Sequence, residues 1–87
     1  MTQERHISVW NNCLHFIEQN IDPQQFTIWF RPIKSVSLVE TALTVEVPSE
    51  FFREYLEDAY LEILKASLKK ELGVAAKLVY VVTPVRQ

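Results

Sequence analysis

Glycine and cysteine are nearly missing from this sequence, and charge of either sign is not in large excess. Its 87 residues include one glycine, one cysteine and a net charge of −2. A single glycine, Gly73, cannot build the glycine-rich loops that hold nucleotide phosphates, so we expect no ATP or dinucleotide cofactor here. The lone Cys13 excludes an internal disulfide and a cysteine cluster, which is typical of a protein in the reducing cytosol.

Long apolar runs are also missing. None approaches the ~20 residues that a membrane-spanning helix needs, and the first ten residues lack the apolar stretch of a signal peptide. A weakly negative chain is a poor match for strong phosphate-backbone binding, which usually requires a basic surface. We therefore expect a cytoplasmic domain without membrane contact, for which weak single-stranded DNA binding is an alternative function.

Apolar residues are plentiful, at 48% of the sequence with five Phe, three Tyr and two Trp. This apolar content is enough for the core of one domain, and the chain is too short for two domains. The first segment repeats apolar residues at helical spacing, which predicts an amphipathic helix over about residues 4–20 whose buried stripe is Ile7, Trp10, Cys13, Leu14, Ile17 and Ile21. Asp22 and Pro23 begin a short second helix that ends near Arg31, before Pro32.

The period changes to two after Ile33. Val36 and Leu38 alternate with serines, and a second alternating run contains Leu43, Val45 and Val47, so we predict an antiparallel hairpin with one buried face. Ser49 then caps a helix of about six turns that stops at Gly73, and residues 77–83 form a third strand. The sequence does not indicate whether this third strand pairs with the first strand or with the second.

These elements predict an α+β fold in the order α-α-β-β-α-β, with helices packed on a three-stranded sheet. The domain covers residues 1–83, and residues 84–87 are expected to start a linker. The sequence offers few residues for a catalytic or metal site, because His6, Cys13 and His15 do not have the spacing that would bring them together on one helix. We expect no catalytic, cofactor or metal site.

Large apolar side chains exceed what a core of this size can hold. They are concentrated in the first two helices and at the start of the third: Trp10, Phe16, Phe26, Ile28, Trp29, Phe30, Phe51, Phe52, Tyr55 and Tyr60. Surplus aromatic surface on a small domain predicts a protein-docking patch. The nucleic-acid alternative depends on a small basic spot of Arg31, Lys34 and Arg53, with Trp29 or Phe51 stacking on a base.

Several short segments carry a resemblance to a known family. They read VWNNCL from Val9, FTIWFRPI from Phe26, LTVEVPSEFF from Leu43, and Tyr60-Leu61 in the long helix. Together they resemble the DnaA N-terminal domain over about residues 7–82. The resemblance implies a KH-like topology in an α-α-β-β-α-β order, and a module linked in the full-length initiator to an AAA+ ATPase domain and an origin-binding helix-turn-helix domain.

The same resemblance implies roles for five residues. Trp10 falls at a position that supports self-association, and partial exposure would reconcile that role with its place on the buried stripe. Phe51 matches a position that docks replicative helicase or regulators, and Ile28 and Trp29 match a neighbouring partner surface. Gln25 occupies a helicase-contacting position that is Glu in some members, so the contact would be made differently here, unless Gln25 simply caps the second helix. The implied function is weak self-association and recruitment of helicase and regulators, with ATP bound by another domain.

Overall fold

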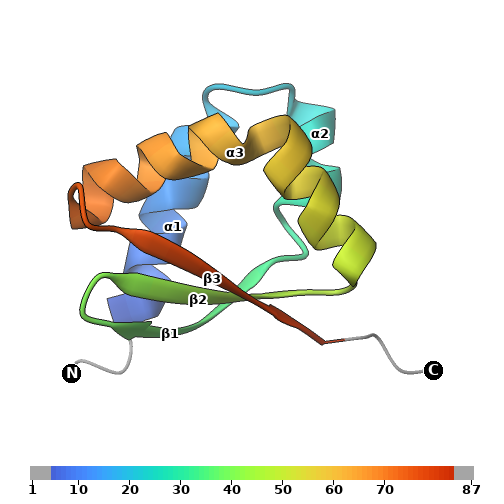
Figure 1. The fold of residues 1–87 in the computed structure, drawn as a ribbon. Helices are drawn as coiled ribbons and strands as arrows, with labels where there is room; N and C mark the ends of the chain where they lie inside the picture. Colours follow the sequence, from blue (N-terminus) through green and yellow to red (C-terminus); the bar gives the residue numbers. More distant parts are fainter. Residues whose placement is uncertain (1–4, 84–87) are drawn as a thin grey trace.

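The computed structural model describes residues 5–83, which form three helices packed on one face of a three-stranded sheet (Figure 1). The helices are α1 (Arg5–Glu18), α2 (Pro23–Trp29) and α3 (Glu50–Leu72), and the strands are β1 (Lys34–Val39), β2 (Ala42–Val47) and β3 (Lys77–Val82). This is the predicted α-α-β-β-α-β order of an α+β domain. The predicted linker start at 84–87 and the first four residues lie outside the described residues.

Strand β2 is the centre of the sheet. It pairs antiparallel with β1 and parallel with β3, so β3 joins the second strand of the hairpin and not the first. The inward side chains of β2, which are Leu43, Val45 and Val47, are at most 2% exposed and form the floor of the core. Both β1 and β3 are consequently edge strands.

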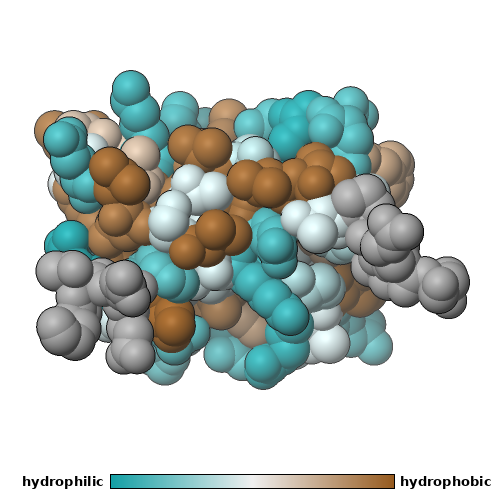
Figure 2. All heavy atoms as spheres, turned by 90° about the horizontal axis from the view of Figure 1, so that it is seen from below, coloured by the Kyte–Doolittle hydropathy of each residue, from teal (hydrophilic) through white to brown (hydrophobic). Residues whose placement is uncertain are grey.

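A β-bulge in β1 changes which of its side chains are buried. The pairing register shifts between Ser35 and Ser37, so Val36 leaves the regular alternation and is 44% exposed. Leu38 stays packed against the core. The prediction that Val36 and Leu38 share one buried face is therefore wrong, because one extra residue reverses the alternation. Viewed from the sheet side, the molecule shows an apolar band (Figure 2), to which exposed valines contribute: Val36, Val39, Val79 and Val81.

The buried face of α1 is turned slightly from the predicted one. Val9, Trp10, Cys13 and Ile17 are buried, whereas Ile7 is 47% exposed. The predicted stripe is thus wrong at Ile7, and it also left out Val9. The physical reason is that α1 packs against both β1 and α3. Its buried face is therefore wider than the single stripe formed by residues three and four positions apart.

Tyr60 breaks the regularity of α3. Its backbone has φ −127° and ψ 16°, and Figure 1 shows the helix bending between its yellow and orange halves. Apolar spacing predicted one helix of about six turns, and a bend does not interrupt that spacing. The bend lets the ring of Tyr60 meet the ring of Phe30 edge-on at 5.3 Å while Leu64 and Leu68 stay in the core.

The helix boundaries follow the local chemistry that the sequence predicted. The carboxylate of Asp22 accepts the backbone N–H groups of Gln24 and Gln25, and the hydroxyl of Ser49 accepts that of Phe52 at 3.1 Å. Gly73 ends α3 with φ 91°, a left-handed conformation that suits glycine. Helix α2 ends at Trp29, slightly before the predicted Arg31.

Candidate protein-docking surface

Stacked aromatic rings join α2 to the first half of α3. Trp29 lies on Tyr55 with ring centroids 3.9 Å apart and planes inclined by 19°, and it also contacts Phe52 at 4.9 Å. Such pairs contribute about 0.5–1.5 kcal/mol beyond the burial of their area. The stack therefore joins α2 to α3 at Trp29 and Tyr55.

Gln25 forms hydrogen bonds with two members of the surrounding aromatic cluster. Its side-chain oxygen accepts a hydrogen bond from Nε1 of Trp29 at 3.1 Å and another from the hydroxyl of Tyr60 at 3.3 Å. Asp22, and not Gln25, caps α2, so the capping role considered for Gln25 is filled by a neighbour. The side chain of Gln25 thus connects α2 to the bend of α3.

Replacing Gln25 with alanine is expected to lower the free energy of unfolding by about 1–2 kcal/mol, because two partly buried donors lose their acceptor. Gln25→Glu keeps an acceptor and should cost less. Urea denaturation followed by tryptophan fluorescence measures both. Gln24→Ala, an exposed neighbour in α2, is the matched control and should change stability by less than about 0.5 kcal/mol. Equal stability of Gln25→Ala and the control would contradict the assigned hydrogen bonds.

Two large apolar side chains project from this pair of helices into solvent. Phe51 is 70% exposed and Ile28 is 52% exposed. The side chains of Trp29 and Tyr55, which stack on each other, are partly buried. Phe51 and Tyr55 line one open hollow on α3, and Ile28 lines another on α2. We call Ile28, Trp29, Phe51 and Tyr55 the α2–α3 surface.

Acidic side chains border the Phe51 part of this surface. Glu54, Glu57 and Asp58 line the hollow together with Arg53. The guanidinium of Arg53 donates to Glu50 and, at 2.9 Å, to Glu57, which holds the pKa of the Glu50 carboxyl below its usual value. The one cation of the hollow is thus already engaged by carboxylates, and the border is acidic.

Trp10 lies in the core and not at the surface. It is 3% exposed, so the partial exposure that would reconcile packing with a self-association contact is not found. Its Nε1 is a buried polar atom that has no hydrogen-bond partner within residues 5–83. Of the four other residues singled out in the sequence, Gln25 and Trp29 are in contact, Ile28 lies exposed on α2, and Phe51 lies exposed at the start of α3.

The basic spot considered for nucleic acid is largely occupied. Arg31 lies over the ring of Phe26 at 5.4 Å, and Arg53 is held by Glu50 and Glu57. One face of Trp29 is covered by Tyr55. Of the residues considered for nucleic acid, Arg31, Arg53 and one face of Trp29 are thus engaged within the domain, whereas Lys34 and Phe51 are exposed.

Side chains with catalytic potential are dispersed. Burial raises the pKa of the Cys13 thiol to about 11, so it stays protonated and unreactive at neutral pH. His6 shares a hydrogen bond with Ser35 at 2.8 Å, and His15 shares one with Gln19 at 3.2 Å. No group of His, Cys, Asp and Glu within residues 5–83 could hold a metal ion, and none of the described helices is long and apolar enough to cross a membrane.

Tyr55 lies in the aromatic cluster, although the sequence indicated it only as one of the surplus aromatic residues. The signal was available, because Tyr55 follows Phe51 by four residues and so lies on the same helix face. The bond between Tyr60 and Gln25 could not be found in this way, since 35 positions separate them and only the bend of α3 brings them together.

Known proteins resemble this chain over most of its length. Residues 7–70 match the family described as DnaA N-terminal domain. The chromosomal replication initiator protein DnaA of Flavobacterium psychrophilum is 56% identical over 84% of this chain, and that of Bacteroides fragilis is 38% identical over 92%. The chain spans only 15% and 17% of the length of these two relatives.

A solved structure shares the fold. It is the crystal structure of a HobA–DnaA (domain I-II) complex from Helicobacter pylori, which matches with a TM-score of 0.70 over 85% of this chain and 96% of that one. Sequence identity is 16%, so this likeness supports the fold of α helices on a three-stranded sheet and not the details of any contact.

Proposed function

This chain belongs to the DnaA N-terminal domain family, and on that premise we propose that it docks other proteins onto a chromosomal replication initiator through the α2–α3 surface. The partners in this proposal are the replicative helicase and regulators of initiation. In this proposal the chain is an interaction domain and not an enzyme, and any ATPase activity belongs to another part of the initiator.

Phe51 is the observation that supports this proposal most directly. A phenylalanine that is 70% exposed costs solvation free energy unless a partner covers it, and aromatic anchors of this kind often dominate binding. Its neighbours are held rigid by the Trp29–Tyr55 stack, so little side-chain entropy is lost when a partner binds. The H. pylori complex, whose DnaA fragment has this fold, is a complex with another protein.

The acidic border suggests the chemistry of the partner. With Glu54, Glu57 and Asp58 around the hollow of Phe51, a matching surface would offer an apolar socket surrounded by lysine or arginine. Gln25 is engaged with Trp29 and Tyr60, so in this proposal it positions Trp29 and does not supply the charge that Glu supplies in other members.

Weak self-association is part of the same proposal. Since Trp10 is buried, its role would be to hold α1 in place and not to touch a second copy. We also propose a cytoplasmic location, and we propose that ATP binding and origin recognition belong to other domains of the initiator.

Replacing Phe51 with alanine is expected to weaken binding to the replicative helicase of the same bacterium by at least tenfold, a loss of about 1.4 kcal/mol. Isothermal titration calorimetry measures the affinity, and far-UV circular dichroism verifies the fold. Val39→Ala is the matched control, because Val39 is 66% exposed but lies on β1. Undiminished binding by Phe51→Ala, or equal losses in both variants, would argue against the α2–α3 surface as the docking site.

A further inference from the structure

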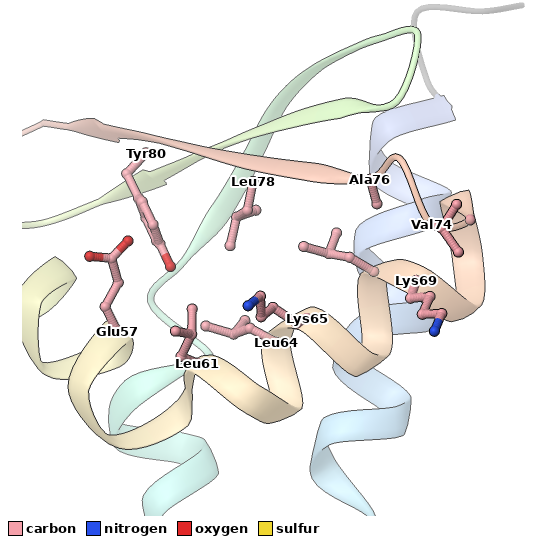
Figure 3. Close-up of a pocket in the computed structure, with 11 residues that line it drawn as sticks. Glu57, Leu61, Leu64, Lys65, Lys69, Val74, Ala76, Leu78 and Tyr80 are labelled. Atoms are coloured by element: carbon pink, nitrogen blue, oxygen red, sulfur yellow. The ribbon is translucent and has the colours of Figure 1, made fainter.

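A separate groove lies between the second half of α3 and the edge strand β3 (Figure 3). Its volume is about 330 Å³, and most of its lining is apolar: Leu61, Leu64, Leu68, Val74, Ala76 and Leu78. Figure 3 shows Leu78 and Tyr80 pointing from β3 toward α3. We call it the α3–β3 groove. It shares Glu57 and Leu61 with the hollow beside Phe51 but extends away along α3.

The outer edge of β3 has backbone groups available for pairing. The N–H groups of Lys77 and Thr83 donate to carbonyls of the β2 side, those of Thr41 and Val47, at 2.9 Å each. In a parallel ladder alternate residues face the same neighbour, so the backbone N–H and C=O groups of Leu78 and Tyr80 face the free edge. An unpaired edge of this kind is a template for another strand.

Charge is distributed unevenly along the groove. Lys65 and Lys69 border it one helical turn apart, and neither forms an ion pair with another residue of the described part of the chain. Glu57 lies at the other end, where it is bonded to Arg53. Burial raises the pKa of Tyr80 to about 12, so its hydroxyl stays a neutral donor beside the groove. The groove thus offers unmatched positive charge at one end.

We propose that the α3–β3 groove binds an extended segment of a partner polypeptide as a fourth strand beside β3. The inward side chains of that segment would be apolar opposite Leu78 and Tyr80 and acidic beside Lys65 and Lys69. Backbone pairing with the edge supplies affinity, and the alternate side chains that enter the groove supply specificity. The unpaired Lys65 and Lys69 favour an acidic partner segment as the occupant, and pairing with a second copy of this chain is an outcome that the test distinguishes.

A short peptide tests the site. In this peptide, threonine alternates with larger residues, which are leucine, leucine and glutamate in that order. A second peptide carries the same residues in the reverse order, so that either strand direction can form. We expect the amide protons of Leu78 and Tyr80 to gain protection from hydrogen exchange when it binds. Lys65→Glu should weaken binding by about fivefold, and the double variant with Lys69→Glu by more than about tenfold.

Controls separate this site from the α2–α3 surface. Arg5→Glu makes the same change of charge at the start of α1, where a carboxylate is tolerated by the helix dipole, and it should leave peptide binding unchanged. Phe51→Ala should also leave it unchanged, so failure of one site does not imply failure of the other. The proposal is overturned by equal binding of a peptide with lysine in place of glutamate, by protection elsewhere than β3, by no binding at all, or by dimerisation through β3 without peptide.

Discussion

Phe30→Ala is expected to lower the free energy of unfolding by about 3–5 kcal/mol, the usual cost of deleting a buried phenylalanine ring. Phe30 is 0% exposed, and the centroid of its ring lies 5.9 Å from that of Phe26 and 5.3 Å from that of Tyr60. Because a domain of this size has a total stability of about 5–15 kcal/mol, the loss should lower the melting temperature by more than about 12 °C. Urea denaturation and thermal melting by circular dichroism measure the effect.

The same substitution elsewhere provides the control. Phe51→Ala removes an identical ring from a site that is 70% exposed and should change stability by less than about 0.5 kcal/mol. Phe30 also joins α2 to the bend of α3 through its contact with Tyr60, so its loss should weaken binding at the α2–α3 surface as well. A small effect of Phe30→Ala, comparable to that of Phe51→Ala, would mean that the ring is not packed as described.

Trp10→Ala should also cost about 3–5 kcal/mol, since an indole that is 3% exposed leaves a large cavity. A loss of self-association in this variant could therefore arise from unfolding alone. Trp10→Phe distinguishes the two causes. It keeps most of the ring and removes the unpaired Nε1–H, so it should change stability by no more than about 1 kcal/mol.

Sedimentation at several concentrations then tests the role of Trp10. If the ring only holds α1 against the core, Trp10→Phe should self-associate as the parent does. A folded Trp10→Phe variant that stays monomeric at concentrations where the parent associates would show that the indole takes part in the contact between copies. That result would require α1 to move in the associated state.

Features that depend on neighbouring residues in the sequence were predictable. Asp22, Ser49 and Gly73 mark helix ends because capping and positive φ are satisfied within one turn of the chain. The exposure of Phe51 was also within reach, since Phe51 and Phe52 point about 100° apart on a helix and both can hardly be buried.

Features that depend on contacts between distant segments were not predictable. The bulge at Val36 and the bend at Tyr60 leave the apolar pattern intact, and the pairing of β3 with β2 has no local signal. Trp10 shows the same limit from the other direction. Its position on the stripe fitted both a core residue and a contact residue, and only the packing of α1 against α3 and β1 decides between them.

The parallel pairing of β3 with β2 affects how the domain folds during its synthesis on the ribosome. Lys77 lies beside Ala42, 35 positions earlier, so the central strand acquires its second neighbour only after the whole of α3 has been synthesised. Contacts of such sequence separation form late, because the loop between them must first be closed. Until β3 emerges, the nascent chain exposes one unpaired edge of β2, and this is the interval in which it is most open to misfolding and to chaperones.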